Sequence, residues 1–339
     1  MKALKKLSYL LLIMMAFSVN ISVSHAKDLA AGFTVEGVPN EKQIDKDVGY
    51  FYLKENPGDT DEIKVKLVND SDKPKTLLIN IVDANTNVNG AVDYTGGLEK
   101  HSSLKLPLTS IVKTSKKEVV VPKNSEIETS LNVTMPTTSF DGVTVGGVVI
   151  SEKNKETTDK NMSIGNTYSY TIAIVLSNDE NTPIKNNISL ELDSVGAVLF
   201  DGKKMVEADI LNKNPYIFDN ATITGAIYAK GSTEKIIANK KENVVIAPYS
   251  SFPFQFDWKK DNLKPGIYRF VGKAISGDKE WLFEDEFEIT GKQAKKFNNE
   301  SVFKVYIPAW LDWGTMVVGA LSTIGTIGLF IRKQRRAKN

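Results

Sequence analysis

The sequence predicts an all-β fold of two tandem immunoglobulin-like β-sandwich domains, followed by one C-terminal transmembrane helix. Apolar and polar residues alternate with period two in stretches such as "EIKVKLVN", "YSYTIAIVLS" and "FPFQFDW", which is typical of half-buried strands. Turn signals such as Asn89-Gly90 and Lys264-Pro265-Gly266 recur between these stretches. The uncharged run "GTMVVGALSTIGTIGLFI" near the end of the chain predicts the helix.

Residues 1–26 are predicted to be a secretory signal peptide. Three lysines come before an apolar run, "LSYLLLIMMAF". The small residues Ser24 and Ala26 occupy the minus-three and minus-one positions of a cleavage site. The alternative is a short transmembrane anchor. Because the apolar run is too short to cross a bilayer comfortably, the signal peptide is the better interpretation.

The middle of the chain divides into two halves that resemble each other. Roughly 280 residues are too many for one sandwich and suit two. The stretch "VVVPKNSEIETSLNVTMP" followed by "DGVTVGGVVIS" is matched later by "VVIAPYSSFPFQFDW" followed by "PGIYRFVGKAIS". Pro122 and Gly142 of the first half correspond to Pro248 and Gly266 of the second. Each half is therefore predicted to repeat the same strand order.

The boundary between the halves has two interpretations. The charged stretch "SEKNKETTDKNMS" is either a linker or the loop of a long hairpin that joins "GGVVIS" to "YSYTIAIVLS". A linker ends the first domain near Glu152. A hairpin adds a last strand at 168–177 and makes "NDENTPIKNN" the linker, which we favour because a sandwich ending at Ile150 would leave an exposed edge.

Residues 310–331 are predicted to span the membrane, with a buried core helix as the alternative. Basic residues at one end of a span hold that end in the cytoplasm, so 332–339 should be a cytoplasmic tail and the two sandwiches should lie outside, which the family resemblance described below places in the cell wall. The chain would then be a single-pass protein of the cell membrane. The anchoring residues are the aromatic pair at the outer edge and the basic cluster of the tail: Trp310, Trp313, Arg332, Lys333, Arg335 and Arg336.

Composition excludes several classes of function. The chain has no cysteine, which removes disulfides, lipid attachment through a cysteine and thiolate metal sites. Of its 43 basic residues three lie in the signal and five in the tail, so 35 remain against 41 acidic residues and the exported part carries a net charge of −6. Such a surface predicts no nucleic-acid partner. No cofactor is predicted either.

A hydrolase is the competing class, and we predict that the chain is not an enzyme. Nucleophilic catalysis needs a base, and after signal removal His101 is the remaining histidine, predicted to lie exposed in a loop. A glycosidase needs two carboxylates. The candidate pairs, Glu284 with Glu286 and Asp59 with Asp61, alternate along a strand or crowd a turn, as solvated residues do. No catalytic residue is therefore assigned.

The stretch "DANTNVNGAVDY" matches a calcium loop only in part. Asp83, Asn85 and Asn87 take the first, third and fifth positions, but the glycine and glutamate required at the sixth and twelfth are absent. No metal site is predicted. Asn89-Gly90 instead predicts a tight type I′ turn, in which both residues have positive φ.

Six motifs in order, "GYFYLKENPGDTDEIKVKLVNDS", "DANTNVNGAVDY", "FDGVTVGGVVIS", "NTYSYTIAIVLS", "ADILNKNP" and "LKPGIYRF", resemble the WxL-interacting protein family of Gram-positive cell surfaces. The resemblance implies that 27–152 is a peptidoglycan-binding sandwich and that 163–302 is a host-binding sandwich. It also implies partnership with secreted WxL-domain surface proteins. The implied function is attachment to peptidoglycan and to WxL-domain proteins, with a contribution to host or matrix adhesion.

Candidate ligand-binding residues follow from that resemblance and from residue chemistry. "TNVNG" belongs to a motif of the implied peptidoglycan-binding domain, and amides and tyrosine rings are groups that a glycan engages. The alternative is a structural turn with tyrosines packed in the core or at an edge. The aromatic residues of "FPFQFDW" are assigned to the core. The candidates are Asn85, Thr86, Asn87, Asn89, Gly90, Tyr94, Tyr50 and Tyr52.

Overall fold

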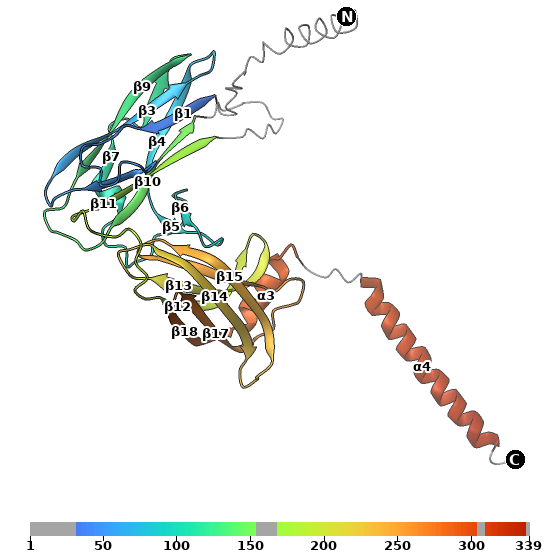
Figure 1. Cartoon of the computed structure of the whole chain (residues 1–339). Helices are drawn as coiled ribbons and strands as arrows, with labels where there is room; N and C mark the ends of the chain where they lie inside the picture. Colours follow the sequence, from blue (N-terminus) through green and yellow to red (C-terminus); the bar gives the residue numbers. More distant parts are fainter. Residues whose placement is uncertain (1–31, 154–167, 304–308, 337–339) are drawn as a thin grey trace, which may run out of the picture.

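Two β-rich bodies follow one another along the chain, and a separate long helix comes after them (Figure 1). The structure is a computed structural model that describes residues 32–153, 168–303 and 309–336. The predicted signal peptide, residues 1–26, lies outside the described residues. Both bodies consist of strands arranged in two sheets, so the mostly β prediction is confirmed.

The first sandwich has the sheet orders β1-β3-β9-β7 and β2-β11-β10-β4-β8. Strands β2 and β11 are parallel, whereas the other neighbours are antiparallel. A short hairpin, β5–β6, and the one-turn helix α2 lie between β4 and β7 in the chain. The elements are β1 Phe33–Gly37, β2 Phe51–Lys54, β3 Thr60–Asn69, β4 Lys75–Asp83, β5 Asn85–Thr86, β6 Val92–Asp93, α2 Leu108–Ile111, β7 Val112–Thr114, β8 Glu118–Val121, β9 Ser125–Thr134, β10 Thr144–Glu152 and β11 Ser169–Ser177.

Alternating residues build the first core. In β3, Ile63, Val65 and Leu67 are fully buried, while the lysines between them lie on the other face. Burial of each such side chain contributes about 1.5–3 kcal/mol. Strand β10 is different because it is buried on both faces, and Gly146 at its centre leaves room for Leu108 of α2 to lie against the sheet.

Strands β10 and β11 pair as an antiparallel hairpin. Their register runs from Thr144 opposite Leu176 to Ser151 opposite Ser169. The charged residues 154–167 between them lie outside the described residues. The sheet of the first sandwich therefore extends to Ser177, beyond the position near Glu152 that the linker interpretation requires.

The second sandwich has the sheet orders β12-β13-β16 and β15-β14-β17-β18. Phe252, Phe254, Phe256 and Trp258 are buried in its core, as predicted for "FPFQFDW". Phe254 and Phe256 meet edge to face at 4.9 Å between ring centroids. The strands are β12 Glu191–Phe200, β13 Lys203–Asn212, β14 Phe218–Ala229, β15 Lys235–Ile246, β16 Ser250–Asp257, β17 Gly266–Ser276 and β18 Lys279–Ile289.

The two sandwiches share a strand order. The series β3, β4, β8, β9, β10, β11 and the series β13 to β18 make the same neighbours, with β3-β9 matching β13-β16 and β8-β4-β10-β11 matching β15-β14-β17-β18. Side chains repeat as well. Asn69 and Asn212 each donate to carbonyl oxygens at the end of β8 and β15, respectively. Asn124 and Tyr249 both have positive φ, at 48° and 54°, in the turn that follows.

Helix α3, Gly291–Glu300, closes the second sandwich and was not predicted. Thr290 begins it with a capping box, because its hydroxyl accepts from the Gln293 N–H at 3.2 Å and the Gln293 side chain accepts from the Thr290 N–H at 3.0 Å. The Asn298 side chain bonds both the N–H and the carbonyl of Leu263. These contacts fix the helix to the loop between β16 and β17.

Helix α4, Ala309–Arg336, contains all six residues predicted to anchor the chain. The described side chains from Met316 to Ile327 are exposed. A search of the described residues finds no helix that is long and apolar enough to cross a membrane. The span predicted over 310–331 is therefore not shown by the structure.

Candidate functional site

The hairpin β5–β6 carries most of the predicted ligand residues. Its turn is not type I′, because Gly90 has a φ of +72° but Asn89 does not have a positive φ. The Gly90 N–H donates to the Asn87 carbonyl at 2.9 Å, and the Asn87 N–H donates to the Ala91 carbonyl at 3.0 Å. The Asn87 side chain accepts the Asn89 N–H, which holds Val88 and Asn89 in a right-handed type I turn, and Gly90 follows as a bulge.

This hairpin is held against the second sandwich. Thr86 is 2% exposed, and its hydroxyl accepts from the Ala247 N–H at 3.0 Å and hydrogen-bonds the Ser250 hydroxyl. The Gly90 carbonyl accepts from the Val245 N–H at 2.8 Å. Thr86 and Gly90 therefore join the two sandwiches, and Thr86 is out of reach of a glycan.

The three candidate tyrosines also lie at this joint. Tyr52 is buried in an apolar cluster shared by the two sandwiches, and its phenol donates to the Thr182 carbonyl of the linker. Tyr50 and Tyr94 pack against the same cluster while remaining partly exposed. The cluster contains Tyr52, Ala84, Val143, Val145, Val175, Ile217 and Ala247.

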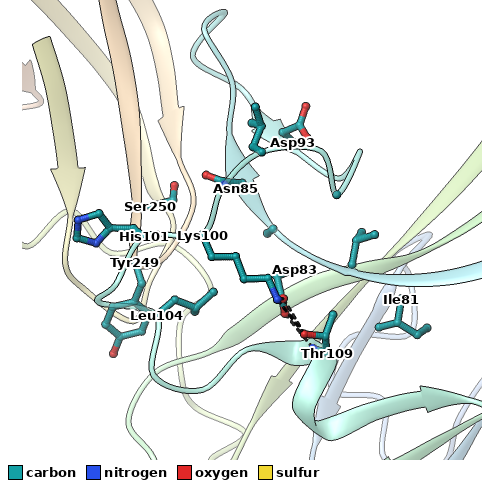
Figure 2. Close-up of a pocket in the computed structure, with 14 residues that line it drawn as sticks. Ile81, Asp83, Asn85, Asp93, Lys100, His101, Leu104, Thr109, Tyr249 and Ser250 are labelled. Carbon is teal, nitrogen blue, oxygen red and sulfur yellow. Dashed lines mark hydrogen bonds and ion pairs between the residues drawn. The ribbon is translucent and has the colours of Figure 1, made fainter. Parts of the chain in front are cut away.

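Two adjoining cavities form a groove beside the joint, which we call the interdomain groove. Their volumes are about 140 and 440 Å³, and Leu104 and Tyr249 line both. One wall is the segment 96–106 of the first sandwich, and the other is the turn between β15 and β16 of the second. In Figure 2 the labelled side chains of both sandwiches converge on the smaller cavity, with Tyr249 and Leu104 close to each other.

Hydrogen bonds and an ion pair connect the polar side chains of the smaller cavity to one another and to the backbone. Asp83, at the end of β4, accepts from the Thr109 N–H at 2.9 Å and from the Thr109 hydroxyl at 2.8 Å, and it pairs with Lys100 (Figure 2). The Asn85 side chain donates to the Glu99 carbonyl at 2.7 Å. Over the described residues no group of three or more His, Cys, Asp or Glu side chains is placed to hold a metal ion. Asp83 is thus engaged as a structural acceptor.

The larger cavity is lined by apolar side chains and by three charged ones, Lys105, Lys213 and Asp141. Leu106, Phe140, Val143 and Pro248 are among its lining residues. Lys213 pairs with Glu191 at 2.5 Å, and Lys105 makes no ion pair within the described residues. Sequence reasoning missed this groove, since its two walls come from segments about 145 positions apart.

Tyr249 stands between the two cavities. A positive φ is uncommon for a tyrosine and costs of order 1 kcal/mol or more, and such residues cluster at ligand sites. Burial, followed by the nearby Asp141 and Tyr216, raises the pKa of Tyr249 above its usual value. The phenol therefore stays neutral and can donate a hydrogen bond.

Two family models match the chain. Residues 33–152 match the peptidoglycan binding domain of the WxL Interacting Protein, and residues 159–299 match its host binding domain. The chain belongs to the WxL-interacting protein family. Strand β11 falls inside the second matched range although it pairs within the first sandwich. No curated protein matches the chain.

Solved structures similar to this chain include chaperones of bacterial fimbriae. A chaperone–tip adhesin complex of CFA/I fimbriae is 12% identical, with a TM-score of 0.30, and the match covers 76% of this chain and 98% of that chain. The YadV chaperone is 13% identical, with a TM-score of 0.27, over 76% and 100% of the two chains. The E. coli chaperone DraB is 11% identical, with a TM-score of 0.29, over 71% and 96%.

His101 is partly buried, so the prediction of an exposed loop histidine is wrong. Its Nε2 lies 3.4 Å from the Asp193 carboxylate of the second sandwich, and its Nδ1 lies 2.7 Å from the Ser103 hydroxyl. Serine, histidine and aspartate are the residue types of a nucleophilic triad. Nδ1, however, also accepts the Ser103 N–H at 3.1 Å, so the serine contact belongs to a local turn.

The candidate carboxylates of the sequence each have their own partner: Asp59 pairs with Lys42 at 3.3 Å, and Asp61 accepts from the Asn40 side chain at 2.9 Å. Glu284 pairs with Arg269 at 2.9 Å and Glu286 with Lys230 at 2.8 Å, on the exposed face of β18. Sequence reasoning missed Glu55, the carboxylate with the largest change in pKa among the described residues. Its side chain is 0% exposed. Burial raises its pKa to about 7, although Lys42 at 2.5 Å opposes the rise. Glu55 lines none of the described cavities.

Replacement of Thr86 by valine should destabilise the joint between the two sandwiches by about 1–3 kcal/mol, because the buried Ala247 N–H loses its acceptor. Thermal unfolding of the full chain would measure the loss. Thr134→Val, on an exposed position of β9, is the matched control. Equal stability of the two variants would contradict the structural role of Thr86.

Proposed function

We propose that this protein is a membrane-anchored cell-surface binding protein that attaches to peptidoglycan and to WxL-domain surface proteins, and that contributes to host or matrix adhesion. Membership of the family and the two matched domains support the cell-surface and binding parts of this proposal. The uncharged sequence 314–331 followed by a basic tail supports the anchor and its orientation.

We infer that peptidoglycan binds in the interdomain groove, and the composition of its walls is the observation that carries this inference. Peptidoglycan joins sugar rings to short peptides that carry free carboxylates. The Tyr249 ring suits stacking on a sugar, the apolar lining suits aliphatic peptide groups, and Lys105 and Lys213 suit the carboxylates. Among the predicted ligand residues, Asn85 lines the groove and Asn89 is exposed.

The competing function is hydrolysis of wall glycan. Both matched models describe binding domains, which favours binding. Each predicted carboxylate pair is committed to ion pairs or local hydrogen bonds, and Glu55 is enclosed. A hydrolase would release reducing ends from purified peptidoglycan, whereas a binding protein would sediment with it and release none.

Tyr249→Gly is the variant that tests most directly whether the groove binds peptidoglycan. Glycine keeps the left-handed backbone of the turn, so the substitution removes the ring with little strain. Combined with Lys105→Gln, it should weaken sedimentation with peptidoglycan tenfold or more, which corresponds to about 1.4 kcal/mol.

The matched control is Asn124→Gly, which makes the same backbone change in the equivalent turn of the first sandwich. Its peptidoglycan binding should equal that of the unaltered chain. If the double variant still binds as the control does, the groove is not the peptidoglycan site. Alanine substitution of Asn85 and Asn89 then tests the hairpin alone.

A further inference from the structure

One end of the second sandwich gathers three segments of the chain. Strand β16 starts at the joint between the sandwiches and runs to this end, where it lies beside the turn between β12 and β13. The Trp258 N–H donates to the Lys204 carbonyl at 2.9 Å, and the Val302 N–H donates to the Gly202 carbonyl at 2.9 Å. Helix α3 is tied to the same loop through Asn298. We call this end, made of residues 201–204, 257–264 and 291–303, the α3 surface.

The α3 surface is basic, although the exported part of the chain is acidic. Its three segments hold eight lysines and four acidic residues. Elsewhere lysines form most of the ion pairs of the described residues, but no such pair includes the six exposed lysines of this surface. These six are Lys259, Lys260, Lys264, Lys292, Lys295 and Lys296.

Two apolar side chains project beside these lysines. Val302 is 72% exposed and Phe303 is 44% exposed. The Ser301 hydroxyl donates to the Gly202 carbonyl at 2.9 Å, which fixes the segment, and the Lys203 ammonium lies 5.4 Å from the centre of the Phe303 ring. An apolar tip surrounded by cations is the composition of surfaces that bind the headgroup region of anionic membranes.

The position of the surface in the chain points to the same partner. Five residues, 304–308, separate Phe303 from the start of α4. The chain there spans at most about 20 Å, at about 3.5 Å per residue. If α4 anchors the chain, this tether holds the α3 surface close to the lipid headgroups and gives it a high effective concentration there.

We propose that the α3 surface docks on the anionic headgroups of the membrane that α4 enters. This inference rests on the anchor of the proposed function. Docking places the second sandwich on the membrane and directs the first sandwich and the interdomain groove outward into the wall. Polybasic surfaces gain about 1 kcal/mol per lysine near an anionic membrane, and salt screens this attraction.

Hydrogen exchange on the full chain tests the docking. The chain is reconstituted in vesicles of phosphatidylcholine alone or of phosphatidylcholine with phosphatidylglycerol. Exchange of the amides of 257–264 and 291–303 should slow about tenfold in the anionic vesicles and return to the neutral-lipid rate at high salt. Lys295→Glu with Lys296→Glu should abolish the difference, whereas the adjacent exposed pair Lys116→Glu with Lys117→Glu should not.

Equal exchange in the two lipids, or an unchanged difference in the Lys295→Glu/Lys296→Glu variant, would overturn the docking. Extraction of the vesicles with alkaline carbonate separates the two proposals. A chain that resists extraction but shows no lipid-dependent exchange keeps its anchor and loses the docking. Release of the chain by carbonate would overturn the anchor. Docking would then predict that the chain floats with anionic vesicles, but not with neutral ones, at neutral pH. Failure to float with anionic vesicles would overturn the docking as well.

Discussion

Glu55→Gln should remove the contribution of Glu55 to the pH dependence of stability between about pH 4.5 and 7. The pKa of Glu55 is raised from 4.5 to about 7 by burial. Folding therefore binds a proton in this interval. The stabilisation is fully present below pH 4.5 and is lost as the pH rises through 7, when the enclosed carboxylate must ionise. A shift of this size corresponds to about 3 kcal/mol.

Glutamine keeps the shape of the side chain and needs no ionisation. Its oxygen can accept from Lys42, and its amide can donate to the Asp61 carboxylate that the protonated Glu55 faces. The variant should therefore be more stable than the unaltered chain at pH 8 and similar below pH 4.5. Denaturant unfolding across this range is the measurement. Glu128→Gln, at an exposed position, is the control, and parallel pH profiles for Glu55→Gln and the unaltered chain would refute the assignment.

Gly146→Ala should destabilise the first sandwich by about 3 kcal/mol or more. A Cβ at this position would lie 2.2 Å from the Val82 carbonyl oxygen and 2.5 Å from the Leu108 side chain. Neither neighbour can move cheaply, because Val82 belongs to the paired strand β4 and Leu108 is fully buried in α2. Displacement of α2 would also move Thr109 away from Asp83 and open the polar wall of the groove.

Gly196→Ala is the matched comparison, since Gly196 also lies in a strand, without positive φ, and has open space at its Cβ position. Urea unfolding of both variants should show a large loss for the first and a change within about 0.5 kcal/mol for the second. Similar midpoints would mean that the sheet tolerates the added methyl group.

Strands were predictable from the sequence because a strand with one buried and one exposed face alternates apolar and polar residues. Phe252, Phe254 and Phe256 repeat every second residue, and all three are buried. The repeated strand order was predictable for the same reason. The turn at Asn89-Gly90 was not, because the Asn87 side chain selects a type I turn over the type I′ turn that the dipeptide favours. Helix α3 carries only a narrow apolar stripe, so its pattern gave a weak signal.

The candidate site was less predictable, because long-range contacts create it. Nothing next to Thr86 in the sequence indicates that Ser250 will bury it, and nothing near Glu55 indicates that its carboxylate will be enclosed. The internal repeat gave no signal for Tyr249 either, because pairing Pro122 with Pro248 aligns Tyr249 with Lys123. In the structure Tyr249 takes the place of Asn124, which also has a positive φ.

We propose that peptidoglycan binds between the two sandwiches. The direct measurement is photo-cross-linking of the full chain with a soluble peptidoglycan fragment that carries a photoreactive group, followed by mass-spectrometric mapping of the attachment positions. We expect attachment within 98–106 and 247–250, and competition by the unlabelled fragment. Attachment confined to the exposed face of β14, β17 and β18, or to the far end of the first sandwich, would contradict the claim.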